Sequence, residues 1–484
     1  MFDWLMGTNP LDKTMFPWDK HNALSVRNLL AGGIHTFGRT DAGKTSSMVQ
    51  IARAFLEHRN SSMLILCAKK GEYRDWLYLA RKCGRKRDVV LIDPKERWRF
   101  NMFGYEAERK GEGAGNAQNV TRFIMELRNV VFRESEQQGG ESQQWKKQDE
   151  RLITHSVVLL QQAGEALTPA NLHDLIIDAP HTAAKLSDEA WRKGYFNACL
   201  AIAFNRRKTD IEEHDYCLAR DFFTKEWPRM ADRTRSSILM GTMGTLMVCN
   251  SGIAREMFAD RTNVTPREAI ERRKIVIVNL PPDEWGDVGA VGNIGWKHHW
   301  QNDVLRRDIT RRSPITCIWG DESSLWVTPS DSRYLSRCRS YWGCMVYICQ
   351  SLNSYREALG GEKSEAAIQS MLANFGHKLF FSLGDYDTAE FASDLCGKEL
   401  RQFSGGGLQH GPSDPFSMFR EQPQFSSNFH ESFEQVIQPS EFMNGLRTGS
   451  PVNRYQVDAV LVRSGVPFSN GLPFLDVTFD QRKS

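Results

Sequence analysis

The chain has 484 residues, of which 40% are hydrophobic and 25% are charged, and its formal net charge is +3. The composition is that of an ordinary globular protein, and the length excludes a single small core in favour of two or three domains. Because the net charge is so small, charge alone predicts no nucleic-acid surface, and any such surface has to be local.

The sequence contains no membrane or export signal that we can identify. No stretch approaches 18 consecutive apolar residues, and the first residues, MFDWLMGTNPLDK, have neither a basic region nor an apolar signal core. We therefore expect no transmembrane helix and no signal peptide.

The ten cysteines are scattered and form no C-x-x-C pair. Cys67, Cys317 and Cys349 lie in segments that read as buried strands. This pattern indicates reduced core cysteines in a cytosolic protein, and it does not favour a metal site built on cysteine.

Residues 35–49, HTFGRTDAGKTSSMV, contain the spelling G-x-x-x-x-G-K-T. Where a strand precedes it and a helix follows, this spelling forms a loop whose N–H groups and helix N-terminus surround phosphates. Lys44 would then reach the β/γ-phosphates and Thr45 would bind Mg²⁺. The alternative is a glycine-rich turn before an ordinary helix. The candidate nucleotide-binding residues are Gly38, Arg39, Thr40, Asp41, Ala42, Gly43, Lys44, Thr45 and Ser46.

The surroundings of this loop favour the phosphate-binding interpretation. GGIHTF before the loop is a short strand-like run, and Met48, Ile51 and Phe55 recur at helical spacing after it. MLILCA (63–68) and DVVLIDP (88–94) are apolar runs typical of strands buried on both faces. Strands that alternate with helices predict a parallel α/β sheet.

The middle third of the chain is helical in pattern. Apolar residues mark one face of helices over 118–131 and 145–162, and Thr168 with Pro169 predicts a helix start. Helical signals continue to about Phe258, and 134–144 is the clearest mobile loop. These signals predict an all-helical insert of roughly 150 residues.

Strand signals then resume. Thr265 and Pro266 predict another helix start, and 274–281, 315–322, 344–351 and 378–384 read as buried strands. The composition of 402–428, rich in Gly, Ser, Pro and Gln, predicts a flexible loop. The final 50 residues alternate weakly and are expected to add edge strands.

Two polar groups follow neighbouring strand segments. Asp321 and Glu322 end the strand 315–322, where Asp321 would hold Mg²⁺ and Glu322 would polarise the attacking water. Gln350 ends the next strand, where its amide could sense or orient the γ-phosphate. The alternative is a solvated acidic pair in a turn after a strand.

Taken together, these segments resemble the TraG/TraD-type coupling proteins of conjugative type IV secretion systems, which belong to the HerA–FtsK group of RecA-like motors. The resemblance rests on the phosphate loop, GDESS, CQSLNSYREALG, NFGHKLFFSLGDYDTAEFASDLCGK, AKKGEYRDW, RSSILMGTMGTLMVCNSGIAREMFA and VIQPSEFMNGL, which follow in the family's order from about residue 30 to 462. It implies a RecA-like P-loop fold with a mainly parallel sheet and an inserted all-α domain.

The resemblance also implies site residues and boundaries. Lys44, Thr45, Asp321, Glu322 and Gln350 match the family's nucleotide site. Arg339 matches the arginine that the family supplies to the neighbouring subunit's ATP, with Arg337 as the alternative. We expect a nucleotide-binding domain in two parts, 1–114 and 263–484, around a helical domain at 115–262.

Two positions depart from the family pattern. Asp41 stands where the family usually has glycine in a left-handed conformation, and Gly320 stands where it usually has an apolar residue. The basic runs 81–87 and 306–312 could contact a DNA backbone, but we interpret them as solvated faces before strands.

The resulting hypothesis is an ATP- and Mg²⁺-dependent motor that forms a ring, most simply a homo-hexamer, and moves single- or double-stranded DNA. The resemblance implies a relaxase and type IV secretion channel proteins as partners. The expected location is the cytoplasm, or the inner membrane if a partner protein holds the chain there. The alternatives are a HerA-like DNA translocase in genome processing or phage defence, and a cargo receptor switched by ATP.

Overall fold

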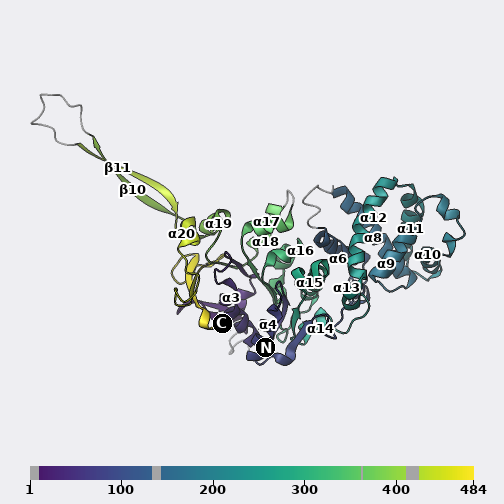
Figure 1. The fold of residues 1–484 in the computed structure, drawn as a ribbon, viewed down its shortest axis with the longest axis horizontal. Coiled ribbons are helices and arrows are strands. Elements are labelled where there is room, and N and C mark those ends of the chain that lie inside the picture. The colour runs from purple at the N-terminus through teal and green to yellow at the C-terminus, as the bar shows by residue number, and fades with distance from the viewer. Residues whose placement is uncertain (1–9, 133–142, 361–363, 410–423, 484) are drawn as a thin grey trace, which may run out of the picture.

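The computed structural model describes residues 10–132, 143–360, 364–409 and 424–483, and a nine-stranded sheet forms its centre (Figure 1). The strand order is β13-β12-β9-β3-β8-β7-β4-β6-β5. In chain order the strands are β3 (Gly33–Phe37), β4 (Ser61–Leu66), β5 (Val89–Ile92), β6 (Ile275–Val278), β7 (Ile315–Gly320), β8 (Gly343–Cys349), β9 (His377–Phe380), β12 (Gln456–Arg463) and β13 (Phe474–Asp480). β3 to β9 are parallel to one another, and β12 and β13 add antiparallel edge strands. The predicted mainly parallel sheet and the edge strands near the C-terminus are confirmed.

Helices cover both faces of the sheet because successive side chains of each strand point to opposite faces. Met63 and Ile65 of β4 join the apolar core that contains α3 (Lys44–Glu57) and α4 (Glu72–Lys82). Leu64 and Leu66 join the core on the other face. That core includes α15 (Pro282–Arg306), α16 (Ser330–Leu335), α17 (Leu352–Leu359), α18 (Ser364–Ala373) and α19 (Tyr386–Cys396). A short antiparallel pair, β1 (Thr14–Pro17) and β2 (Ala23–Ser25), forms a separate two-stranded sheet that packs against β13.

Between β5 and β6 the described residues form helices and no strand. These helices extend to one side of the sheet in Figure 1. The helices are α5 (Met102–Glu108), α6 (Ala117–Val131), α8 (Gln143–Ala163), α9 (Pro169–Asp178), α10 (Tyr195–Asn205), α11 (Asp210–Asp221), α12 (Asp232–Asn250), α13 (Gly252–Phe258) and α14 (Pro266–Glu271). As predicted, the Thr168 side chain caps α9 and Pro169 occupies its first turn. The all-helical insert is confirmed, and its boundaries at 115 and 262 stay a prediction. Residues 134–142 of the predicted mobile loop lie outside the described residues, and Gln143 and Gln144 belong to α8.

A buried polar cluster joins the helical lobe to the sheet. Glu126 of α6 pairs with His298 of α15. The ammonium of Lys297 lies 2.8 Å from Asp331, and both side chains are fully buried. The hydroxyl of Tyr347, on β8, donates to Asp331 at 3.0 Å. Because buried charges are costly unless they are paired, Lys297 and Asp331 each depend on the opposite charge of the other.

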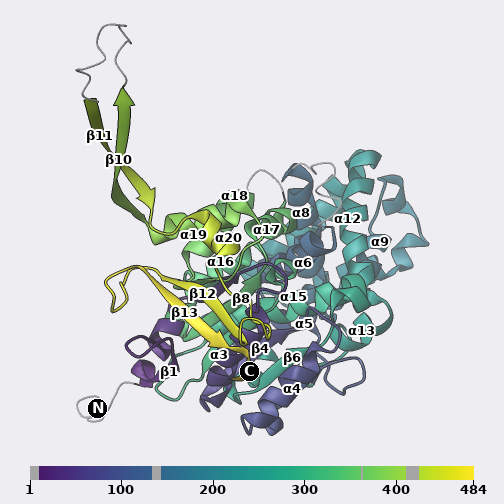
Figure 2. The same cartoon turned by 60° about the vertical axis from the view of Figure 1, so that its left-hand side comes forward.

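The region 402–428 was expected to be a loop, and this is wrong for its two ends. β10 (Lys398–Gln409) and β11 (Gln424–Gln435) pair antiparallel over their whole length and project from the body as an arm (Figure 2). Pairing satisfies the backbone groups by which the two strands face each other, and it overrides the low strand propensity of Gly and Ser. The three prolines of the segment, Pro412, Pro415 and Pro423, lie outside the described residues.

The basic run 81–87 was interpreted as a solvated face, and one of its basic residues is buried. The side chain of Arg85 is 1% exposed and donates to the Ser61 hydroxyl at 2.9 Å and to the Ser61 carbonyl at 3.1 Å. Arg85 therefore fixes the start of β4 in the sheet. A guanidinium with five donors can satisfy several backbone and side-chain acceptors at once, and this capacity makes its burial tolerable.

No single described helix is long and apolar enough to cross a membrane. α12 and α13 meet that requirement only when they are counted together, and they are bent by 77° at their junction. All ten cysteines are free thiols, and all except Cys217 are buried, which agrees with the predicted core cysteines.

A buried carboxyl group between α5 and α15 leads to a pH-dependent prediction. Burial raises the pKa of Asp303 from 3.8 to about 7, although a hydrogen bond from Tyr105 at 2.8 Å opposes this shift. Between pH 4 and 7 the unfolded chain therefore ionises at this position while the folded protein stays protonated, so folding stability falls as the pH rises.

We expect the Asp303→Asn protein to gain stability relative to wild type as the pH rises, by up to about 1.4 kcal/mol per pH unit between pH 4 and 7. The gain should level off above pH 7, since Asp303 is then ionised in both states. Urea unfolding at several pH values measures the difference. A difference independent of pH would show that Asp303 titrates normally.

Candidate active site

Three neighbouring strands bring the predicted site residues to one edge of the sheet. β8 lies between β3 and β7, and all three run in the same direction. The glycine-rich loop 38–43 follows β3, Asp321 follows β7, and Gln350 follows β8. These segments therefore meet where the strands end, which is where open parallel sheets bind ligands.

The loop between β3 and α3 has the geometry expected for phosphate binding. Gly43 adopts a left-handed conformation with φ of 79° at the N-terminus of α3. Since glycine has no side chain, nothing at that position competes with a ligand for the N–H groups of the first turn. The Lys44 ammonium donates to the carbonyl oxygens of Gly38 at 2.5 Å and Arg39 at 2.9 Å, so its side chain lies across the loop.

The charge of Lys44 is placed among acids. Its side chain is buried at 8% exposure. Burial lowers the pKa of Lys44, whereas the carboxylates of Glu322 and Asp321 act in the opposite direction. The Lys44 ammonium therefore corresponds to the lysine ammonium that a P-loop directs at phosphates.

Arg39 and Ser46 are held by side-chain hydrogen bonds, of which only that of Ser46 is local. The Arg39 guanidinium donates to the Ser382 hydroxyl at 3.1 Å, and the Ser46 hydroxyl donates to the Gly43 carbonyl at 3.0 Å. Ala42 is buried at 1% exposure. The exposed residues of the loop are Arg39, Thr40 and Asp41.

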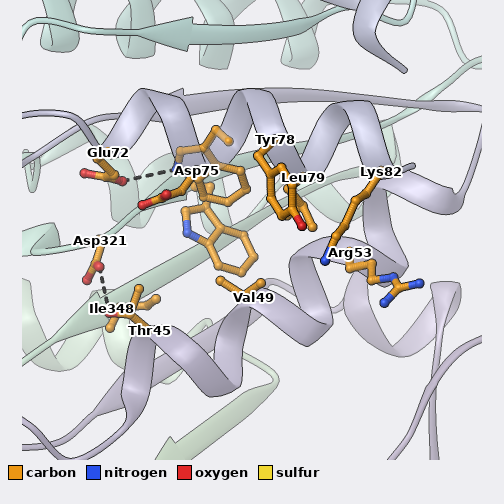
Figure 3. Close-up of a pocket in the computed structure, with 12 residues that line it drawn as sticks. Thr45, Val49, Arg53, Glu72, Asp75, Tyr78, Leu79, Lys82, Asp321 and Ile348 are labelled. Carbon is orange, nitrogen blue, oxygen red and sulfur yellow. Dashed lines mark hydrogen bonds between the residues drawn. The ribbon is translucent and has the colours of Figure 1, made fainter. Parts of the chain in front are cut away.

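Thr45 and Asp321 meet directly. The Thr45 hydroxyl donates to Oδ2 of Asp321 at 2.9 Å, and Figure 3 shows the two side chains facing each other from α3 and the end of β7. A hydroxyl and a carboxylate are oxygen ligands of the kind that Mg²⁺ prefers. The two predicted metal ligands are therefore neighbours.

Glu322 is presented by a strained turn and held by two partners. Its φ of 47° is left-handed, which is uncommon for a residue other than glycine. Lys69 forms an ion pair with Oε1 at 3.1 Å, and the Gln350 amide donates to Oε2 at 3.2 Å. The structure thus places Gln350 on the carboxylate of Glu322.

The glycine that precedes the acidic pair makes room for large side chains. A Cβ atom on Gly320 would lie 3.0 Å from the Trp326 ring and 3.3 Å from the Tyr347 ring. The Trp326 indole N–H donates to the Asp321 carbonyl at 3.0 Å. Gly320, which replaces the family's apolar residue, therefore leaves room for the Trp326 ring that bonds to the backbone of Asp321.

Arg339 does not join the other predicted residues. It lies in the short helix Cys338–Tyr341, before β8 begins, whereas Gln350 follows the other end of β8. Seven strand residues separate the two ends by about 20 Å. Arg339 and Arg337 are both exposed, so each is available to a different molecule but not to its own chain's loop.

Sequence reasoning missed Lys69 and Glu72, which follow β4. Glu72 accepts hydrogen bonds from the backbone N–H groups of Ala68 at 2.8 Å and Lys69 at 3.2 Å. It also accepts from the Trp76 indole at 3.2 Å. Glu72 thereby shapes the turn that carries Lys69 to Glu322. The sequence did contain a signal for these two residues. They belong to the segment AKKGEYRDW, which follows a strand of the same parallel sheet and therefore lies at the edge where the other site residues meet.

A cavity of about 290 Å³ adjoins the Thr45–Asp321 pair. Figure 3 shows Thr45 and Asp321 at one end and Arg53 and Lys82 at the other. Its walls are mainly apolar side chains of α3, α4, β7 and β8, namely Val49, Trp76, Leu79, Trp319 and Ile348.

The C-terminal residues also reach the loop. The Gln481 amide donates to the Ser46 hydroxyl at 3.0 Å, and its oxygen accepts from the backbone of Ser450 at 3.2 Å. A Cβ atom on Gly43 would lie 2.7 Å from Val457. The edge strands β12 and β13 therefore pack beside the start of α3.

Comparison with known proteins gives one family match and several structural matches. Residues 314–444 match the family model described as the TraM recognition site of TraD and TraG. The resemblance to TraG/TraD-type coupling proteins is confirmed. No curated protein matches the chain.

The structural matches show a shared fold. The bacterial conjugative coupling protein TrwB in an unbound form has 13% identity and a TM-score of 0.56, over 95% of this chain and 87% of that chain. TrwB bound to the GTP analogue GDPNP has 12% identity and a TM-score of 0.58, over 94% and 86%. TrwB bound to ADP and Mg²⁺ has 13% identity and a TM-score of 0.54, over 94% and 86%. The fold is therefore the RecA-like P-loop fold with an inserted all-α domain.

The conformation of Asp41 yields a prediction about the loop. Asp41 has φ of 60°, as the family's glycine at this position implies. Asp41→Gly should relieve the left-handed conformation and remove a negative charge near bound phosphates, so we expect ATP to bind about two- to tenfold more tightly. Titration with a fluorescent ATP analogue measures this. Unchanged or weaker binding would show that the Asp41 carboxylate points away from the phosphates.

Proposed function

We propose that the protein is a ring-forming, Mg²⁺-dependent ATPase that moves DNA and delivers a relaxase–DNA substrate to a type IV secretion channel. The main support is the contact of Thr45 with Asp321, beside a loop whose two ends are bridged by the hydrogen bond from Lys44 to Gly38. The family match over 314–444 supports the role in conjugation. Structures of TrwB with the ATP analogue ADPNP and with ADP and Mg²⁺ support the same ligands here.

The side chains that are present fit Mg²⁺ and a nucleoside triphosphate. Thr45 and Asp321 would hold the metal, since their oxygen atoms already lie 2.9 Å apart. Lys44 and the N-terminus of α3 would hold the β/γ-phosphates. Bound Mg²⁺-ATP supplies the phosphoanhydride bond whose hydrolysis releases the energy.

Glu322 is the proposed base. Its carboxylate orients the attacking water and accepts a proton from it. Gln350 contacts one carboxylate oxygen and Lys69 contacts the other, so both oxygens have a partner before ATP arrives. These contacts limit the freedom that a general base would otherwise have to lose during the reaction.

A neighbouring copy is proposed to complete each site. Arg339 stands about 20 Å along β8 from its own chain's Gln350, so its guanidinium can serve only another subunit's ATP. Repeating this head-to-tail contact closes a ring, and we propose a homo-hexamer. In that ring the two parts 1–114 and 263–484 would form the motor, and 115–262 would form the helical domain.

DNA, a relaxase and channel proteins are the proposed partners. DNA contacts would lie on loops facing the centre of the ring, where nucleotide-driven movement of subunits can pull the strand. Attachment to the inner membrane would come through a partner protein. A DNA-pumping motor hydrolyses ATP continuously as it moves DNA, whereas a receptor switched by ATP does not, and this difference distinguishes the two functions.

The test is an ATPase assay of the purified full chain with and without single- and double-stranded DNA. We expect hydrolysis that requires Mg²⁺, is absent from Glu322→Gln protein and increases several-fold with DNA. Slow turnover that DNA does not raise would favour the cargo receptor. No hydrolysis under any of these conditions would overturn the proposal.

A further inference from the structure

We propose that Tyr355 is a positioning residue for the candidate base Glu322, acting through Ser323 and anchored on His35. This inference rests on the ATPase function proposed above. Tyr355, Ser323 and His35 lie outside the phosphate loop and are not among the proposed Mg²⁺ ligands. All three side chains are fully buried at 0% exposure.

The three side chains form a short buried chain of hydrogen bonds. The Tyr355 hydroxyl lies 2.6 Å from the Ser323 hydroxyl and 2.7 Å from Nε2 of His35. The Ser323 hydroxyl also donates to the Ile348 carbonyl at 3.0 Å.

Each end of this chain is close in sequence to a residue of the candidate site. Ser323 directly follows Glu322, and Ile348 precedes Gln350 by two residues on β8. His35 lies on β3, which leads into the phosphate loop. Tyr355, in α17, is therefore the point at which the phosphate-loop strand, the acidic turn and the strand that carries Gln350 are joined.

The direction of each hydrogen bond follows from the acceptor at one end. A carbonyl can only accept, so the Ser323 hydroxyl donates to Ile348 and its oxygen accepts from Tyr355. The Tyr355 oxygen then accepts from Nε2–H of His35. Burial lowers the pKa of His35 well below its usual value and Lys378 lowers it further, so the ring is neutral. Its hydrogen bond to the Tyr355 oxygen then assigns the single ring proton to Nε2. Nδ1 of His35 is buried without a hydrogen-bond partner among the described residues, as a neutral ring with this tautomer allows.

The turn needs such an anchor because Glu322 is strained. Its left-handed backbone, with φ of 47°, persists only if the surroundings hold it. On one side of Glu322, the Asp321 carbonyl accepts from the Trp326 indole at 3.0 Å. On the other side, Ser323 is tied to β8 and to Tyr355. If the link to Tyr355 is lost, the turn can relax and the base can move away from the attacking water.

Packing alone does not explain the tyrosine hydroxyl. The Tyr355 ring contacts the rings of His35 and Phe37 at centroid distances of 5.6 and 6.4 Å, contacts that phenylalanine would also make. Burying a hydroxyl is costly unless it forms hydrogen bonds, and here it bonds to one residue adjacent to the base and to one residue on the phosphate-loop strand.

The test compares Tyr355→Phe with wild type in steady-state ATP hydrolysis and in equilibrium binding of a fluorescent ATP analogue. We expect kcat to fall at least about fivefold, because a small misplacement of a base strongly slows the reaction, while the Kd changes less than about twofold. Tyr347→Phe is the matched control. It removes an equally buried hydroxyl, which donates to Asp331 rather than to the acidic turn, and it should keep kcat near wild type.

A double-mutant cycle then tests the link through Ser323. Ser323→Ala should lower kcat by a factor similar to that of Tyr355→Phe, and the double variant should be no slower than the slower single variant. If the double variant lowers kcat by the product of the two single factors, the link through Ser323 is overturned. An equal loss of kcat in Tyr347→Phe would overturn it as well. Unchanged kcat in Tyr355→Phe with active wild type overturns this inference alone, whereas inactive wild type overturns the proposed function and this inference with it.

Discussion

The Lys44→Ala protein is expected to lose ATP hydrolysis almost completely, with kcat reduced by at least about a hundredfold. The Lys44 ammonium lies across the loop, on the carbonyl oxygens of Gly38 and Arg39. Asp321 and Glu322 already place negative charge beside it. Without this cation, the developing charge on the β/γ-phosphates loses the ammonium that lies across the loop. The measurement is Mg²⁺-dependent ATPase activity of purified protein, together with circular dichroism to show that the fold is kept.

A matched control removes an ammonium outside the loop. Lys70 is 83% exposed and pairs with Glu284 at 2.7 Å on the surface. Such an exposed pair contributes little, so Lys70→Ala should keep both the fold and most of the activity. Wild-type activity in Lys44→Ala protein would contradict the motor function, because it would mean that the loop does not hold the reacting phosphates.

The phosphate loop could be predicted from the sequence because its determinants are local. Gly43 supplies the left-handed residue at the start of α3, and Met48, Ile51 and Phe55 supply the buried face of that helix. The apolar run 63–68 is long and bounded by turns, so it identified β4 with its boundaries shifted by two residues. These features depend on residues within about one helix or strand of each other.

The meeting of Thr45 with Asp321 was also predictable, although 276 positions separate them. Both residues stand at positions that a parallel sheet brings to one edge: Thr45 lies in the first turn of the helix after a strand, and Asp321 directly follows a strand. The prediction rested on the chemistry of the pair, because a phosphate loop needs an acidic residue to hold Mg²⁺. A parallel sheet brings the two residues to one edge, but their contact also requires β3 and β7 to lie close together, with one strand between them.

Contacts that depend on strand order and on long-range packing could not be predicted. Lys69 reaches Glu322 because β4 lies next to β7, and Tyr355 reaches His35 because β3 lies next to β8. No spacing or periodicity encodes these adjacencies. The ladder of β10 and β11 was missed for a related reason, since glycine and serine lower strand propensity while pairing with a second strand compensates for it.

The other large effect concerns Arg339 and requires two copies of the chain. Arg339→Ala should bind ATP nearly as wild type does but hydrolyse it poorly, because the guanidinium acts on a neighbour's phosphates rather than on its own. Glu322→Gln should also bind ATP and fail to hydrolyse it, because its own site cannot activate water. Each variant alone is therefore expected to be nearly inactive for a different reason.

Mixing the two inactive proteins should restore activity. In a mixed ring, a subunit with intact Glu322 can sit next to a subunit with intact Arg339, and the site between them is then complete. With random assembly from equal amounts, about a quarter of the sites are complete, so we expect recovery to about a quarter of wild-type activity that depends on protein concentration. ATPase assays of the mixture, with ring assembly followed by light scattering, measure this.

The position of Arg339 in the fold makes the result decisive. Arg339 lies before the start of β8, and Glu322 contacts Gln350 after the end of β8, so no rearrangement of side chains alone brings the guanidinium to its own chain's base. Recovery in the mixture therefore has to come from contact between subunits. If mixed rings form and stay inactive, Arg339 does not complete the neighbouring site. The same mixing experiment with Arg337→Ala then tests the other exposed arginine at this end of the strand, because Arg337 borders the same short helix and faces solvent from the same edge of the sheet.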